Sequence, residues 1–141
     1  MRSYLRKINY YETDQMKIVH HSNYIRYFEE ARCYFLECIN YPYAKLEEEK
    51  ILSPVLSVSC EYKSPVRYPD EIEIEVMLVE LNKVKAAFEY RVIDSNTKKV
   101  KAIGRTEHCF IDENGRVISV AKTNPLFYDV LTNELEHGIE K

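Results

Sequence analysis

A chain of 141 residues with 45% hydrophobic residues, 3 Gly and 5 Pro is long enough to bury one core, and its composition is not that of a disordered chain. A single domain over residues 1–141 is therefore expected. The net charge of −3 argues against a nucleic-acid or membrane-surface partner. The first seven residues lack the apolar region of a signal peptide, and no apolar run approaches the ~20 residues that span a bilayer, so a cytoplasmic protein is expected.

The four cysteines follow neither a CxxC pattern nor a metal-ligand spacing. Free thiols in a reducing compartment are predicted for them, with disulfides as the less favoured alternative. The sequence implies no metal and no other cofactor. The cysteines are Cys33, Cys38, Cys60 and Cys109.

The first third of the chain is predicted to hold a strand and a long helix. Residues 3–12 are rich in Tyr and Ile, which is typical of a strand. Between residues 22 and 39 apolar side chains recur at steps of three and four, which predicts a helix with a wide apolar stripe. Asn40-Tyr41-Pro42 ends it, and a short polar helix is expected over 43–50. The stripe comprises Tyr24, Tyr27, Phe28, Ala31, Tyr34, Phe35, Cys38 and Ile39.

The rest of the chain is predicted to be mainly strand. Residues 51–63 form one run. In the next, apolar residues alternate with glutamates from Glu71 until the phase changes at Met77-Leu78-Val79, which indicates a bulge or a stretch covered on both faces. The remaining elements are strands over 84–92 and 100–110, turns at Asn82-Lys83, 94–97 and 112–115, and a C-terminal helix with Asn124 as N-cap and Pro125 as first residue.

This order, a strand, a long helix and then four antiparallel strands joined by short turns, predicts an α+β fold. A helix with so wide an apolar stripe must be buried on most sides. An antiparallel sheet that curls around the long central helix satisfies this requirement.

Asp14 follows the first predicted strand, and the apolar helix begins shortly after it. This arrangement can place a carboxylate beside the free backbone N–H groups of a helix N-terminus. An attacking or water-activating group is then paired with donors for a developing oxyanion. An Asp between a strand and a helix is also commonly a turn or N-cap residue, and the residues alone favour that interpretation.

The segment from Tyr11 to Tyr24, followed by Tyr27-Phe28-Glu29-Glu30-Ala31-Arg32, resembles the signature of hotdog-fold acyl-CoA thioesterases of the 4-hydroxybenzoyl-CoA thioesterase type. The resemblance implies a hotdog fold, an antiparallel sheet wrapped around a long central helix, over nearly the whole chain. It implies that Asp14 attacks the thioester carbonyl or activates a water that does. It also implies that the backbone N–H of His21 binds the thioester oxygen, and that Glu30 is structural.

The resemblance and the need for cations near the phosphates of CoA define the expected substrate-binding residues. Solvated turn lysines and a core tyrosine are the competing interpretations. The adjacent histidines His20 and His21 also suggest a metal site, but neighbouring side chains point in different directions on most backbones, so no metal site is expected. The expected substrate-binding residues are Val19, His20, Asn23, Tyr24, Lys63, Arg67, Lys83 and Lys85.

Lys17 departs from the family pattern, which is Asp-x-x-Gly-x-Val and usually has Gly at this position. Gly permits a positive φ. Lys17 therefore either keeps a left-handed conformation, at a cost of roughly 1–2 kcal/mol, or lies on a different loop path.

An acyl-CoA thioesterase that releases a free acid and CoA is therefore expected, with neither the acyl group nor the exact role of Asp14 indicated. The family implies a homodimer or homotetramer with sites between subunits, which would also cover a strand edge. Two alternatives remain: a hotdog hydratase or dehydratase acting on acyl thioesters, and a non-catalytic acyl-ligand binding module. Release of free thiol, hydration of enoyl-CoA, and binding without turnover would distinguish the three.

Overall fold

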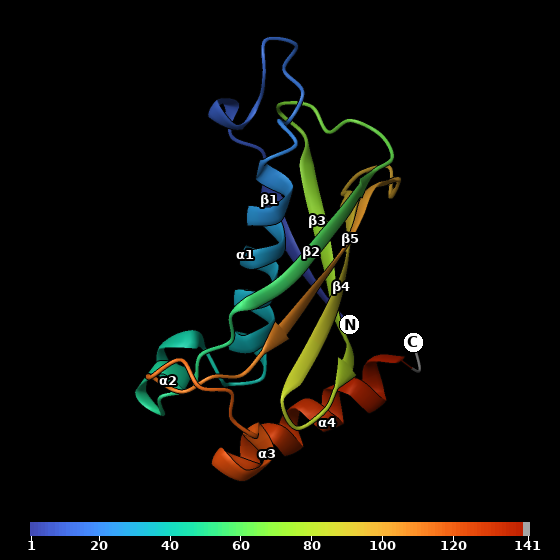
Figure 1. The fold of residues 1–141 in the computed structure, drawn as a ribbon. Helices are drawn as coiled ribbons and strands as arrows, with labels where there is room; N and C mark the ends of the chain where they lie inside the picture. The colour runs from blue at the N-terminus through green and yellow to red at the C-terminus, as the bar shows by residue number, and fades with distance from the viewer. Residues whose placement is uncertain (140–141) are drawn as a thin grey trace.

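The computed structural model of the protein describes residues 1–139. A five-stranded antiparallel sheet has the strand order β1-β3-β4-β5-β2, and helix α1 lies along it (Figure 1). The strands are β1 (Arg2–Lys7), β2 (Val55–Tyr62), β3 (Glu71–Leu81), β4 (Lys85–Asp94) and β5 (Val100–Cys109). The helices are α1 (Asn23–Cys38), α2 (Tyr43–Glu48), α3 (Val120–Thr123) and α4 (Pro125–Ile139), with a 3-10 turn, η1, at Tyr10–Glu12. The expected α+β class is confirmed.

Helix α1 packs its apolar stripe against the sheet. Phe28 is fully buried and stacks on Tyr90 of β4 with a ring-centroid distance of 4.5 Å, and Phe35 meets Phe88 edge-on. Gly104 in β5 makes this approach possible, because a Cβ there would lie 2.3 Å from the Phe28 ring. The helix predicted over residues 22–39 is thus found within one residue at each end.

The irregular features expected in the middle strands are also present. The register of β3 and β4 shifts between Leu78 and Glu80, where the alternation changes phase. At the hairpin, the side-chain oxygen of Asn82 accepts the N–H groups of Val84 and Lys85 at 2.9 and 2.8 Å. This side chain supports the tight turn in a hairpin that lacks the usual Gly.

Three expectations about the elements were wrong. The first strand was expected to reach residue 12 but ends at Lys7, because the Glu12 side chain accepts the N–H of Asn9 and bonds Arg6, which folds residues 10–12 into η1. The second predicted strand begins at Val55 rather than at residue 51. Although β2 precedes β3 in the chain, it pairs with β5, so residues 63–70 cross the sheet instead of forming a short turn.

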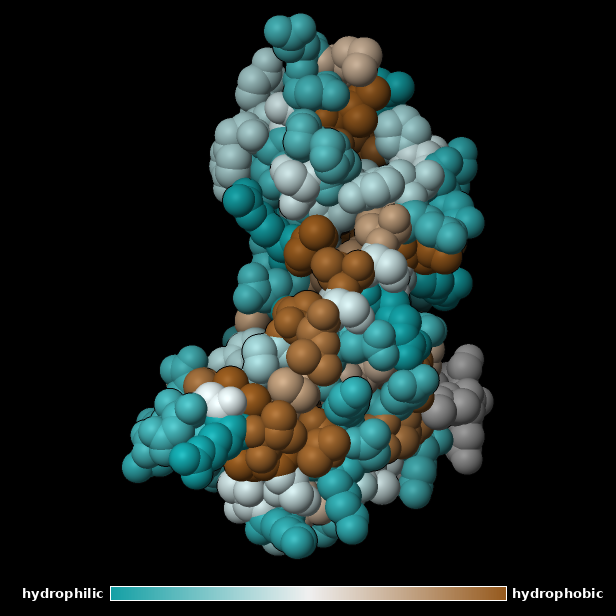
Figure 2. Space-filling view, in the orientation of Figure 1, coloured by the Kyte–Doolittle hydropathy of each residue, from teal (hydrophilic) through white to brown (hydrophobic). Residues whose placement is uncertain are grey.

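The two edge strands differ in character. Edge strand β1 carries Arg2, Arg6 and Lys7, and charged side chains commonly protect an edge from pairing. Edge strand β2 is apolar and exposed, with Val55, Leu56 and Val58 between 41% and 53% accessible. Figure 2 shows apolar side chains along the face of the molecule that carries β2. The β2 edge is therefore an unprotected edge.

All four cysteines carry free thiols, as expected. Within residues 1–139, none of the helices has the length and apolar character needed to cross a membrane.

Candidate active site

Asp14 begins a tight loop at one end of the sheet. The loop closes where Thr13 pairs with Val19 and the Asp14 N–H donates to the Ile18 carbonyl at 2.8 Å. One carboxylate oxygen, Oδ1, accepts the backbone N–H groups of Met16 and Ile18 at 2.8 and 3.2 Å. These bonds fix the carboxylate on the loop, and none of the hydrogen bonds among the described residues uses its other oxygen.

Lys17 adopts the left-handed conformation within this loop, with φ of 61°. Its N–H donates to the Asp14 carbonyl at 3.0 Å, so the Asp14 turn depends on that conformation. The loop has therefore kept the path for which Gly is suited, with a lysine in place of Gly.

The start of α1 lies directly after this loop. The N–H of Asn23 donates to the His20 carbonyl at 3.0 Å and that of Tyr24 to the His21 carbonyl at 3.3 Å. The His20 ring caps the helix start, since its Nδ1 accepts the Ser22 N–H at 3.2 Å. Among the hydrogen bonds of residues 1–139, none uses the N–H of His21. A free N–H group at a helix N-terminus is a donor for an anionic oxygen.

Asp14 and His21 line one groove with a volume of about 360 Å³. Its wall joins the Asp14 loop, the start of α1 and the end of β2. Tyr24 contributes the apolar floor, and burial raises the pKa of its phenol to about 12, so the ring remains neutral. The other lining residues are Ile18, Val19, His20, Tyr62, Lys63, Ser64 and Pro65.

Four predicted substrate-binding residues lie outside this groove. Asn23 is buried, and its side chain donates to the Glu12 carbonyl at 2.8 Å, so it fixes the loop instead of lining the groove. Arg67 pairs with Ile18 beside the loop. Lys83 and Lys85 belong to the β3–β4 hairpin, which lies at the opposite end of the sheet from the Asp14 loop (Figure 1).

Tyr62 is a site residue that the sequence did not indicate. Its hydroxyl donates to the His21 carbonyl at 3.1 Å, and its ring meets the Tyr24 ring edge-on at 4.9 Å. The contact joins the last residue of β2 to the start of α1. A periodic pattern predicts the strand itself, but this contact depends on where β2 lies in the sheet.

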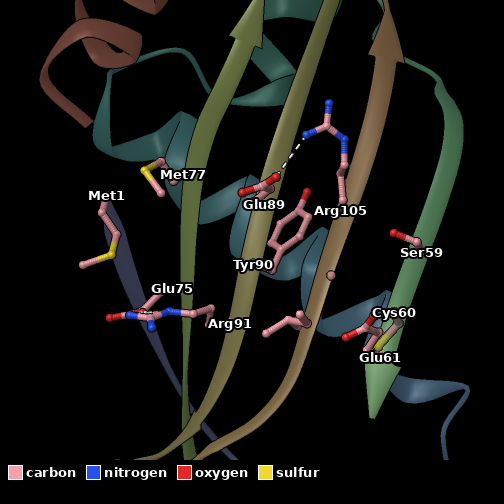
Figure 3. Close-up of a pocket in the computed structure, with 12 residues that line it drawn as sticks. Met1, Ser59, Cys60, Glu61, Glu75, Met77, Glu89, Tyr90, Arg91 and Arg105 are labelled. Carbon is pink, nitrogen blue, oxygen red and sulfur yellow. Dashed lines mark hydrogen bonds and ion pairs between the residues drawn. The ribbon is translucent and has the colours of Figure 1, made fainter. Parts of the chain in front are cut away.

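A second hollow, of about 430 Å³, lies on the other face of the sheet (Figure 3). Along β3 its lining residues, Glu75 and Met77, alternate with the buried residues that face α1, such as Ile74 and Val76. Four of its charged residues pair with one another, Arg91 with Glu75 and Arg105 with Glu89, and Glu61 pairs with Lys63. It contains no predicted site residue and no helix N-terminus, so the groove beside Asp14 and His21 is the candidate active site.

The side chains of the described residues nowhere bring three His, Cys, Asp or Glu residues together for a metal ion. The groove therefore offers a carboxylate, an unpaired backbone donor, two histidines and Lys63 as its functional groups. This set suits attack on a carbonyl carbon with stabilisation of the oxyanion that forms.

Residues 8–134 match the thioesterase-like superfamily. Because this match covers most of the chain, the protein belongs to that superfamily, and the family expected from the sequence is confirmed.

Individual relatives agree with this assignment. A protein of Aquifex aeolicus with a known crystal structure is 38% identical, with a TM-score of 0.85 over 93% of this chain and 99% of its own. The acyl-CoA thioester hydrolase YbgC of Escherichia coli O157:H7 is 25% identical over 63% of this chain and 66% of its own. The DHNA-CoA thioesterase of Staphylococcus aureus has the same fold, with a TM-score of 0.91, 22% identity and coverage of 98% of this chain and 93% of its own.

Proposed function

We propose that the protein is an acyl-CoA thioesterase that hydrolyses an acyl-CoA to a free acid and CoA. The observation that carries this proposal is the shared groove of the Asp14 carboxylate and the unpaired His21 N–H. Membership of the thioesterase-like superfamily and the similarity to an acyl-CoA thioester hydrolase support it. We also propose that the fold is a hotdog fold, in which the sheet curls around α1 as the central helix.

In this mechanism the thioester oxygen accepts the His21 N–H while the carbonyl carbon faces Asp14. As a general base, Asp14 takes a proton from a water whose oxygen attacks the carbon; the C–S bond then breaks and the thiolate of CoA takes up the proton. As a nucleophile, Asp14 attacks the carbonyl carbon and expels CoA as its thiolate, which leaves a mixed anhydride; water then hydrolyses the anhydride to the free acid and restores the Asp14 carboxylate, while the thiolate takes up the proton that is released. One oxyanion donor of this kind typically contributes about 3 kcal/mol to transition-state stabilisation.

We further propose that two copies pair through their β2 edges. This edge has exposed apolar side chains on both faces and its only charged residue is Glu61, so pairing would remove apolar surface from water and satisfy free backbone groups. A two-fold axis makes the paired β2 strands antiparallel. Each Tyr62 end then lies beside the Val55 end of the partner.

This pairing supports a role for the hairpin lysines. Val55 pairs with His108 of β5, which pairs with Ala86 of β4, so Lys85 lies in the row next to the Val55 end. The site groove lies at the Tyr62 end. In the proposed dimer, Lys83 and Lys85 of one subunit lie at the end of the sheet that faces the groove of the other, and we propose that they bind the phosphates of CoA there.

The catalytic proposal is tested by Asp14→Asn, which keeps the shape of the side chain but removes its basicity. Thiol release from a panel of short, long and aryl acyl-CoAs should fall by at least about 1000-fold, because both versions of the mechanism need the carboxylate. Asp112→Asn is a matched control, since Asp112 Oδ1 accepts the N–H groups of the second and fourth following residues in the same way as Asp14.

Wild-type turnover by Asp14→Asn would contradict the proposed mechanism, whereas a loss shared by Asp112→Asn would point to a general effect of the amide on such turns. Hydration of enoyl-CoA without thiol release would instead support a hydratase. The structure offers little for that alternative, because the helix carboxylate of Glu30 is bound to Arg6 and Tyr4.

A further inference from the structure

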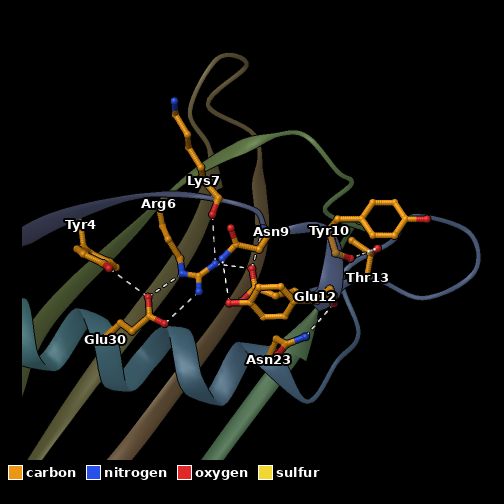
Figure 4. A network of polar contacts seen from close by, with 10 residues as sticks. Tyr4, Arg6, Lys7, Asn9, Tyr10, Glu12, Thr13, Asn23 and Glu30 are labelled. Carbon is orange, nitrogen blue, oxygen red and sulfur yellow. Dashed lines mark hydrogen bonds and ion pairs between the residues drawn. The ribbon is translucent and has the colours of Figure 1, made fainter.

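A polar network lies between β1, η1 and α1, behind the loop that carries Asp14 (Figure 4). At its centre the Arg6 guanidinium binds two carboxylates. Nε donates to Glu30 of α1 at 2.7 Å, and Nη1 donates to Glu12 of η1 at 2.5 Å. Tyr4 completes the network by donating its hydroxyl to Glu30 at 3.1 Å.

Glu12 connects this network to the site. Its side chain accepts the N–H of Asn9 at 2.9 Å in addition to the bond from Arg6. Its backbone carbonyl accepts the His20 N–H at 2.9 Å and the Asn23 side chain at 2.8 Å. Asp14 follows Glu12 by two residues and His21 follows His20, so the carboxylate and the oxyanion donor are both anchored at Glu12.

We propose that Arg6 is a positioning residue for the reaction: by holding Glu12 it sets the Asp14 carboxylate against the His21 N–H, without touching the substrate. This inference rests on the proposed thioesterase function. It assigns a catalytic consequence to a network that lies outside the groove.

The network is strong enough for this role. Glu12 is only 5% exposed, and the Arg6 side chain 14%, so their charges are little screened by water. Burial opposes the charge on Arg6, but hydrogen bonds to Glu30 and Glu12 outweigh it and hold the pKa of Arg6 above its ordinary value. The guanidinium also lies over the ring of Tyr27 at 4.6 Å.

Arginine is specifically suited to this position. Its planar fork binds Glu30 and Glu12 at the same time through different nitrogens, while a lysine ammonium on a longer stem provides a single point of charge. Lysine at position 6 should therefore restore part of the positioning, and an uncharged side chain none of it.

The chain provides a matched control in Arg2. Like Arg6, it lies on β1 and pairs with a helix glutamate, Glu134 of α4. It differs in lying at the end of β1 away from the Asp14 loop. Arg2→Met removes an ion pair between the same strand and a helix without touching Glu12.

The experiment compares Arg6→Met, Arg6→Lys and Arg2→Met in the full-length protein. Arg6→Met should lower kcat about 10- to 100-fold with KM changed by less than about twofold, because a displaced catalytic group affects the chemical step while the groove is retained. Arg6→Lys should recover part of kcat. Arg2→Met should leave kcat within about twofold of wild type even if its Tm falls as much as that of Arg6→Met.

Amide hydrogen exchange gives a readout that does not depend on activity. In Arg6→Met the N–H groups of Asp14, Val19 and His20 should exchange at least about tenfold faster, and in Arg2→Met at the wild-type rate. Unchanged exchange at these amides in Arg6→Met, or unchanged kcat despite faster exchange, would overturn the positioning role. Wild-type activity of Asp14→Asn would overturn the proposed function separately, and exchange would still decide whether Arg6 holds the loop.

Discussion

Lys17 illustrates how one backbone angle determines the position of a functional group. With φ of 61°, it turns the chain so that the Ile18 N–H joins that of Met16 at the Asp14 carboxylate. A side chain with a Cβ is strained in this region by roughly 1–2 kcal/mol, which glycine avoids. The protein thus keeps the turn at the expense of local strain, as is common for loops at functional sites.

Lys17→Gly should stabilise the protein by about 0.5–1 kcal/mol, because relief of strain exceeds the larger entropy of glycine in the unfolded chain. Thermal melts should show a Tm increase of about 2–4 °C. Lys17→Ala is the control: it removes the long side chain but keeps the Cβ, and should give no such increase. A lower Tm for Lys17→Gly would show that this backbone conformation is not strained by lysine.

At the scale of elements, the sequence predicted best what is encoded by neighbouring residues. The stripe of α1 recurs at every turn, so both helix ends were located within a residue. The turn at Glu12 was not predicted, because it depends on Arg6 and on a bond to Asn9 that are not evident in a Tyr- and Ile-rich run. Over so few residues, the sequence pattern of a strand cannot be distinguished from that of a 3-10 turn.

The same distinction applies to the site. Asp14 and His21 are seven residues apart, and the loop and helix that bring them to one groove are encoded between them. Tyr62 reaches His21 only because β2 lies at the edge of the sheet beside β5. Strand order results from packing of the whole sheet, which no local pattern specifies. The separation of Lys83 and Lys85 from Asp14 has the same origin.

A buried polar chain joins α1 to two strands of the sheet. Arg32 of α1 donates to the Tyr90 hydroxyl at 3.1 Å, and Thr106 of β5 bridges Tyr90 and His108 at 2.6 and 2.8 Å. His108 is 1% exposed. Burial, with a smaller contribution from the Arg32 charge, lowers the pKa of His108 to about 4, although a bond to the Ser53 carbonyl opposes the shift.

The sign of the resulting pH dependence follows from linkage. Between pH 6.5 and about 4 an unfolded chain protonates this histidine while the folded protein does not, so protons favour unfolding. The free energy of unfolding should fall by about 3 kcal/mol as pH drops through this window. In denaturant titrations at pH 7 and 4.5, His108→Gln should lose most of this difference, whatever its stability at pH 7.

His20→Gln is the control, since His20 is exposed and lies outside this buried polar chain. A His108→Gln variant with the same fall in stability between pH 7 and 4.5 would assign the acid sensitivity to other groups. Asp94, whose pKa is lowered mainly by the backbone N–H of Thr97, acts at lower pH, below its ordinary value of 3.8.

At the scale of the whole molecule, a single chain holds the proposed chemical groups at one end of the sheet and the hairpin lysines at the other. The β2 edge lies between these two ends and is the apolar, unprotected edge. The proposed pairing through β2 would account for both observations, because it would bring the lysines of one copy toward the groove of the other.

Mixed dimers test this arrangement directly. The double variant Lys83→Ala/Lys85→Ala should raise KM for an acyl-CoA severalfold at unchanged kcat, because the lysines act on substrate binding. Asp14→Asn should be inactive, because Asp14 acts on the chemical step. The two variants are then mixed, unfolded and refolded together, so that mixed dimers form. In each mixed dimer one site is intact, because it has Asp14 from the lysine variant and both lysines from the Asp14→Asn chain. About a quarter of all sites should then show the wild-type KM. An acyl-pantetheine, which lacks the nucleotide phosphates, should be hydrolysed with the same KM by the lysine variant and the wild type. If the mixture shows only the raised KM of the lysine variant, the lysines act within their own subunit or do not contact CoA.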